Sequence, residues 1–247
     1  MLLALFLIQL GAGLYLFLPL VGRRNAGVKF YRLVLIIDGV LVVVAVAAHL
    51  LAGQRRLAAF DGAALVLTAL VYFVLRYPKR LIFRGAALLL ALAFIAASIL
   101  AYDAAVRPAH LAWSVIGSLS TIALLGSVNL AMTLGHWYLV VRGMSIDPLK
   151  RLTIATLVTP IAKLCVVFAA ILIGGAWHEV AIRQGIFFWM RAGWGLAGPL
   201  VLYPMVWGTV KIRSTMAATG ILYVDVVAVV IGEVLGGWLS AIARVPV

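Results

Sequence analysis

Acidic residues and cysteine are scarce in this sequence. Seven Asp and Glu stand against 20 Lys and Arg over 247 residues. So few carboxylates leave little for metal-dependent phosphoryl or prenyl transfer, which relies on acidic groups to hold its cations. The single cysteine, Cys165, excludes an internal disulfide and haem attachment through a CxxCH motif. Because Cys165 lies in an apolar run, we expect it to be a small core residue.

Motifs of soluble enzymes and of nucleic-acid-binding modules are also missing. The chain has no glycine-rich P-loop, HExxH, GxSxG or paired-aspartate motif. Its basic residues are spread over short loops, which argues against a nucleic-acid partner. No Pro/Ser-rich linker or low-complexity tract divides the sequence, so we expect a single transmembrane domain over residues 1–247.

Hydrophobic residues dominate the composition of the chain. Hydrophobic residues make up 66% of the chain, charged residues 11%, and the mean hydropathy is +1.20, which excludes an ordinary soluble globule. Apolar runs long enough to cross about 30 Å of hydrocarbon, at about 1.5 Å per residue, recur along the sequence. We therefore predict an all-α, polytopic helical bundle with about eight transmembrane helices. The runs are Leu2 to Val21, Leu33 to Ala52, Ala58 to Leu75, Leu81 to Tyr102, Ala112 to Val141, Leu152 to Ala176, Gly185 to Val210 and Ala217 to Ile242.

Basic residues are distributed unequally between alternate loops. The richer side faces the cytoplasm by the positive-inside rule, so both termini are predicted to be periplasmic in a bacterial-type inner membrane. The same side should contact anionic lipid head groups. The richer side has thirteen residues: Arg23, Arg24, Lys29, Arg32, Arg76, Lys79, Arg80, Arg84, Arg142, Lys150, Arg151, Lys211 and Arg213. The other has five: Arg55, Arg56, Arg107, Arg183 and Arg244.

A polar stripe runs along the fifth apolar run, Ala112 to Val141. Steps of three and four residues place Ser114, Ser118, Thr121, Leu125, Asn129, Thr133 and His136 on one helical face. Since Asn and His are costly against acyl chains, this face should point at protein, with the other helices gathered round it. Asp38 in the second run has a depth similar to that of His136. We predict that the two meet, and that Asp38, Asn129, Thr133 and His136 form a polar axis for protons or substrate.

Ionisable residues also lie inside the last three runs. Lys163 and Asp225 are both near mid-membrane, whereas Arg191 and Glu233 share the outer third, so two buried charge pairs are predicted. Such pairs either fix helix packing or line a polar pathway. Prolines and glycines interrupt the sixth and seventh runs, which is typical both of close packing and of transporter sites.

A basic turn connects the last two runs. Lys211 and Arg213 precede Ser214 and Thr215, either of which suits a helix N-cap. Two cations beside free backbone N–H groups suggest a contact with a phosphate or a lipid head group.

The four histidines do not form a recognisable ligand set. His49, His110 and His178 map to the outer side and His136 to the inner side, so a two-histidine haem on the inner side is disfavoured. Their spacing also predicts no metal site. Haem b and quinone remain the two cofactors left open by the sequence.

Three function classes remain. The first is a non-catalytic membrane component, either a subunit of a larger complex such as an electron-transfer complex, or a binder of lipid or quinone. The second is a small secondary transporter with a polar site among the last four helices. The third is a lipid-acting enzyme that uses His136 or the basic turn.

The topology prediction can be tested with C-terminal fusions. Because the basic loops hold the opposite face in the cytoplasm, a C-terminal alkaline phosphatase should be active and a C-terminal green fluorescent protein dark. An inactive phosphatase with a bright fluorescent fusion would contradict the predicted orientation.

Overall fold

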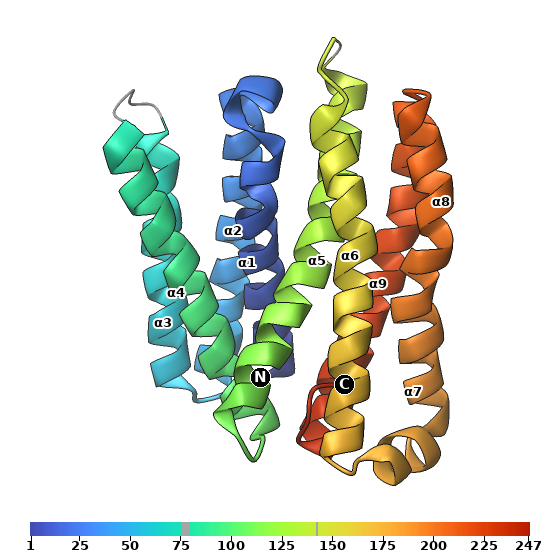
Figure 1. The fold of residues 1–247 in the computed structure, drawn as a ribbon. Helices are drawn as coiled ribbons and strands as arrows, with labels where there is room; N and C mark the ends of the chain where they lie inside the picture. Colours follow the sequence, from blue (N-terminus) through green and yellow to red (C-terminus); the bar gives the residue numbers. More distant parts are fainter. Residues whose placement is uncertain (76–79, 142) are drawn as a thin grey trace.

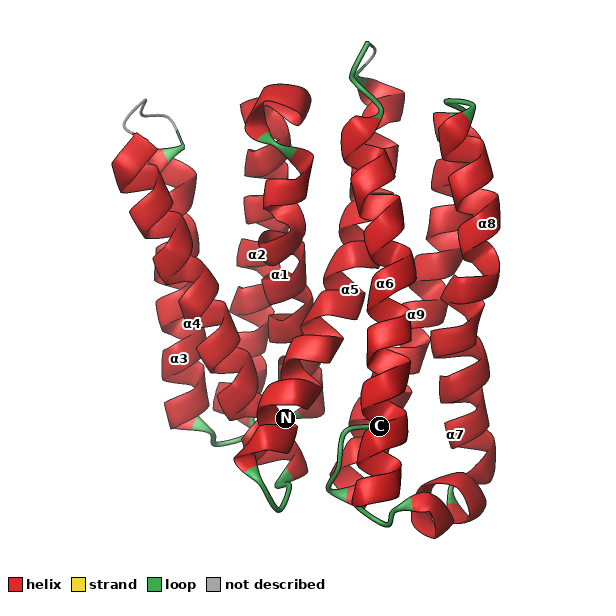
Figure 2. Cartoon of the chain, viewed as in Figure 1, coloured by secondary structure: helices red, strands yellow, loops and turns green. Residues whose placement is uncertain are grey.

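The structure is a computed structural model that describes residues 1–75, 80–141 and 143–247. Within these ranges the chain consists of helices joined by short turns (Figure 2). The helices are α1 (Leu2–Val21), α2 (Arg23–Leu51), α3 (Arg55–Val74), α4 (Arg80–Val106), α5 (Leu111–Val140), α6 (Asp147–Ile173), η1 (His178–Arg183), α7 (Gly185–Met190), η2 (Arg191–Ala197), α8 (Gly198–Lys211) and α9 (Thr215–Ala243).

Eight stretches of this described part are long and apolar enough to cross a membrane, one for each predicted run. The seventh, Gly185–Lys211, combines α7, η2 and α8. The predicted all-α, multi-pass membrane bundle is therefore confirmed. Of the basic residues counted above, Arg76, Lys79 and Arg142 lie outside the described residues.

Several helices begin before their apolar run does. The second span starts at Asn25 and the sixth at Asp147, both within polar sequence. Helices continue past the hydrocarbon because the long stems of Lys and Arg cover apolar surface while their charges reach water. Gly27, with φ 76° and ψ 169°, separates the first turn of α2 from the rest of that helix.

Successive spans run in opposite directions, and both termini lie at the same end of the bundle (Figure 1). We call this the terminal end. Helix α5 occupies the centre and packs against α1, α4, α6 and α9. Ser114 and Ser118 of its polar stripe are fully buried, and Thr121 and Asn129 are 6% and 8% exposed. The central, protein-facing position predicted for this helix is thus present over most of its length.

Two helix crossings depend on paired glycines. Gly13 of α1 faces Gly126 of α5, and Gly195 of η2 faces Gly232 of α9. A Cβ at any of these four positions would come within 3.0 Å of the opposing backbone. Such close approach is how membrane helices gain van der Waals contact without a hydrophobic driving force.

The outer surface is apolar, as a lipid-facing surface should be. Leu51, Ile173 and Val201 are 91%, 75% and 72% exposed. Cys165 is exposed on α6 as well. The expectation of a core cysteine was therefore wrong, because in a membrane bundle an apolar run supplies the lipid face as well as the core.

The segment after α9 folds back into the terminal end. Val245, Pro246 and Val247 are buried, and the Val247 N–H donates to Ser240 Oγ at 2.9 Å. Gly117 of α5 and Gly174 of α6 make room for this segment, since a Cβ there would crowd Pro246 and Val245, respectively.

The Gly13–Gly126 crossing yields a stability prediction. Gly126→Ala should lower the free energy of unfolding by about 1–3 kcal/mol, because the added methyl group forces α1 away from α5. Gly39→Ala is the matched control, since a Cβ there meets nothing within 4 Å. Unfolding in mixed micelles by dodecyl sulfate measures both variants. Equal stability of the two would contradict this account of the crossing.

Candidate functional site

Three charged side chains from three elements meet inside the bundle. Glu233 of α9 accepts a hydrogen bond from Arg191 Nη2 of η2 at 2.6 Å, and its other oxygen lies 3.7 Å from Lys163 Nζ of α6. All three side chains are at most 2% exposed. Two basic groups therefore share one carboxylate in the interior.

Helix α5 supplies the remaining contacts of this ion cluster. Lys163 Nζ donates to Thr121 Oγ1 at 2.8 Å and to Ser120 Oγ at 3.2 Å. These hydroxyls lie on or beside the polar stripe predicted from the sequence. The stripe thus has a definite use, which is to satisfy a lysine that would be costly to bury without partners.

Arg191 is held in a space made by glycines. A Cβ on Gly195, Gly232 or Gly236 would lie within 3.3 Å of its guanidinium nitrogens. Arg191 also begins η2, where the helix widens into π-helical turns. Such turns are uncommon and often occur at functional sites. Nε and Nη1 of Arg191 have no hydrogen-bond partner among the described residues.

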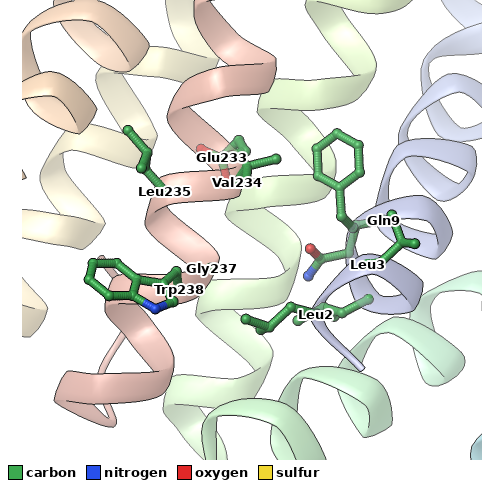
Figure 3. Close-up of a pocket in the computed structure, with 10 residues that line it drawn as sticks. Leu2, Leu3, Gln9, Glu233, Val234, Leu235, Gly237 and Trp238 are labelled. Atoms are coloured by element: carbon green, nitrogen blue, oxygen red, sulfur yellow. The ribbon is translucent and has the colours of Figure 1, made fainter. Parts of the chain in front are cut away.

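A pocket of about 390 Å³ between α1 and α9 leads to this cluster (Figure 3). Glu233 and Gln9 are its polar lining residues, and they project from facing helices. Gln9 Nε2 donates to Ser118 Oγ at 3.3 Å, which ties the amide to α5. The other lining residues are Leu2, Leu3, Leu5, Phe6, Val234, Leu235, Gly237 and Trp238. The site is thus an apolar pocket with an acid on one wall, on α9, and an amide on the facing wall, on α1.

One predicted charge pair is present and the other is not. Arg191 and Glu233 pair as expected, but Lys163 contacts Glu233 instead of Asp225. Asp225 is buried, and its Oδ1 has no partner among the described residues. Because residues 225 and 233 are about 12 Å apart along α9, one lysine cannot serve both.

The predicted meeting of Asp38 with His136 was wrong. Asp38 is fully buried and faces α1, where a Cβ on Gly11 would lie 3.8 Å from its Oδ1. His136 is exposed, and its Nδ1 lies 3.3 Å from the Tyr223 hydroxyl of α9. The two residues differ in depth, because Asp38 lies in the middle of α2 whereas His136 lies four residues before the end of α5. In addition, α1 packs against both α2 and α5, which separates them.

The rest of the predicted polar axis is satisfied within its own helix. Asn129 Nδ2 donates to the Leu125 carbonyl, and Thr133 Oγ1 donates to the Asn129 carbonyl, both at 2.8 Å. These bonds remove the cost of burying polar atoms and join no second helix. The link from this stretch to α6 is made by Ser127 and Thr159, whose hydroxyl oxygens are 2.7 Å apart.

The basic turn lies at the end opposite the termini (Figure 1). Ser214 is the N-cap residue of α9, yet its side chain makes no capping hydrogen bond. Lys211 Nζ lies 5.3 Å from the centre of the Trp207 ring, in cation–π geometry. Arg213 is exposed with φ 57°, and Thr215 begins the helix. Head-group binding by this turn stays a prediction.

Neither the position of Gln9 in a site nor a contact between His49 and Asp61 was predicted from the sequence. Gln9 is the lone amide in α1, and that isolation was the available signal. His49 of α2 and Asp61 of α3 are both buried, with Nδ1 and Oδ2 2.7 Å apart. Each lies a few residues from the short turn between their helices, so the hairpin itself implied the contact. Among the described residues, no three His, Cys, Asp or Glu side chains gather as a metal site would require.

Comparison of the chain with protein-family models, curated proteins and solved structures gives no match. The function must therefore be argued from the geometry of the site.

The ion cluster makes an ordered set of stability predictions. Glu233→Gln should lower the free energy of unfolding by about 3–5 kcal/mol, because it leaves two buried basic groups without their acid. Lys163→Met should cost less, since Arg191 and Glu233 remain paired. Replacing all three residues with Met should be better tolerated than Glu233→Gln alone, because no charge is left unpaired.

Unfolding by dodecyl sulfate in mixed micelles measures this order directly. A Glu233→Gln variant that is no less stable than Lys163→Met would show that Glu233 does not hold the cluster together.

Proposed function

We propose that this chain is an inner-membrane protein that binds one hydrophobic molecule of the lipid or quinone class in the pocket between α1 and α9. The observation that carries the proposal is the pairing of an almost wholly apolar lining with Glu233 and Gln9. Ligand sites of about 300–1,000 Å³ commonly combine an apolar lining with a few polar groups that fix orientation. The volume of about 390 Å³ falls within that range.

The chemistry of the two polar residues suggests the kind of head group. The Glu233 carboxylate accepts hydrogen bonds, whereas the Gln9 amide both donates and accepts. Among the described residues the Gln9 side chain makes one hydrogen bond, to Ser118. A hydroxyl or carbonyl head group therefore suits this position, and the apolar lining of the pocket suits a hydrocarbon tail. Haem has no support from the site, whose lining contains no histidine.

Depth favours a ligand that enters from within the bilayer. Glu233 is ten residues before the end of α9, which places it about 15 Å from the terminal end. Leu3, on the pocket wall, is 58% exposed on the lipid-facing surface. A molecule already dissolved in the membrane would reach Glu233 without crossing water.

Secondary transport is a second candidate, favoured by the widened helix at the same site. The π-helical turns of η2 begin at Arg191, which holds Glu233. Interrupted helices that carry charged groups are common at transporter sites. Uptake into liposomes of the molecule bound in the pocket would distinguish transport from binding alone.

The binding proposal can be tested by filling the pocket. Gly237 lies on the pocket wall, and a Cβ there meets nothing within 4 Å. Gly237→Leu should therefore occupy the pocket without disturbing the helix. Wild-type protein purified in mild detergent should retain about one apolar molecule per chain, and the variant should lose it.

The matched control is Gly220→Leu, also on α9 and also free of contacts at its Cβ, but outside the pocket. It should retain the molecule as the wild type does. Extraction into organic solvent and mass spectrometry measure the content of all three proteins. Equal retention by the Gly237→Leu variant, or no bound molecule in the wild type, would contradict the proposal.

A further inference from the structure

A second cavity, of about 360 Å³, lies at the terminal end and differs in character from the first. Arg107, which follows α4, and Arg244, which follows α9, both line it. His110 and Trp113, at the start of α5, line it as well. None of these residues lines the pocket between α1 and α9. Two basic residues and a histidine thus line one cavity from two parts of the sequence, the connection between α4 and α5 and the segment after α9.

These arginines lack an acidic counterpart. Among the side chains that the structure describes, no carboxylate lies within 4.0 Å of either guanidinium. Asp103, one turn before Arg107, is engaged elsewhere, because its Oδ1 accepts a hydrogen bond from Ser114 at 2.7 Å. Like charges that share a cavity repel each other, so an anion between them would stabilise the arrangement.

The placement of these arginines also runs against the charge bias of the chain. The terminal end carries five of its loop Lys and Arg, and two of those five line one cavity. Arg107 and Arg244 both have left-handed backbones, with φ 51° and 55°. Both residues directly follow a helix, α4 and α9 respectively, and a left-handed residue commonly ends a helix.

We infer that this cavity is a binding site for a phosphate-type anion at the membrane surface of the terminal end. The guanidinium groups of Arg107 and Arg244 suit phosphate oxygens because they present several donors in a plane. Trp113 is of the type that lies at the membrane interface, where lipid phosphates are found. The anion is either free in solution or part of a lipid head group, and both share this chemistry.

Thermal unfolding in dodecyl maltoside tests the site with inorganic phosphate at constant ionic strength, chloride being the exchanged anion. A ligand that binds the folded state raises its stability with a saturable dependence on concentration. The Tm of the wild type should rise by a few degrees and then level off. The same titration with phosphatidylglycerol, against phosphatidylcholine, tests a lipid head group.

The key variant is Arg107→Gly with Arg244→Gly, which removes both charges and suits the left-handed backbone. It should fold and show no rise with either probe. Arg107→Gln and Arg244→Gln alone should each weaken the apparent affinity several-fold. Arg56→Gln, an exposed arginine at the same end but outside the cavity, should respond as the wild type does.

A rise with phosphate identifies a free anion as sufficient, and a rise with phosphatidylglycerol alone identifies the lipid head group. The inference is overturned if neither probe raises the Tm of the wild type, or if the double glycine variant responds equally. Gly237→Leu should leave the Tm response unchanged. The anion-site inference and the proposal for the pocket between α1 and α9 are therefore tested independently.

Discussion

The interior of this bundle depends on one carboxylate shared by two basic groups. Glu233 contacts Arg191 at 2.6 Å and lies 3.7 Å from Lys163, and Lys163 in turn donates to Thr121. The cluster therefore joins α9 to η2, α6 and α5. In hydrocarbon each of these groups would be costly without the others, so the arrangement constrains how the last four spans pack. The glycines around Arg191 follow from the same constraint, because larger residues would displace its guanidinium.

A cluster of this kind can be structural, functional or both. The proposed functional role rests on one observation, which is that Glu233 also lines the apolar pocket between α1 and α9. The proposed binding of a lipid or quinone accounts for the acid, the amide of Gln9 and the apolar lining together.

Sequence reasoning predicted the fold because hydrocarbon thickness sets the length of each span, and every span has that length. It predicted the Arg191–Glu233 pair because depth in the membrane is readable from position along a helix. Depth alone failed elsewhere. Asp225 and Glu233 lie about two turns apart on α9, and Lys163 contacts Glu233 and not Asp225. Asp38 lies in the middle of α2 whereas His136 lies near the end of α5, and α1 packs against both of their helices.

The pocket itself could not be predicted from the sequence, because it arises from how α1 and α9 are spaced around α5. Gln9 gave a hint as a lone amide in an apolar helix, without indicating what it faces. The buried His49–Asp61 contact was easier to predict from the sequence, since a short turn fixes which residues of two adjacent helices face each other. A short turn thus constrains neighbours within a hairpin more closely than depth alone constrains neighbours between distant spans.

An experimental structure in nanodiscs prepared from the native membrane tests the central proposal most directly. The account predicts elongated density of a non-protein molecule between α1 and α9, with its polar end within hydrogen-bonding distance of Glu233 or Gln9. Helices α1 and α9 closed over Glu233, with no molecule between them, would contradict it.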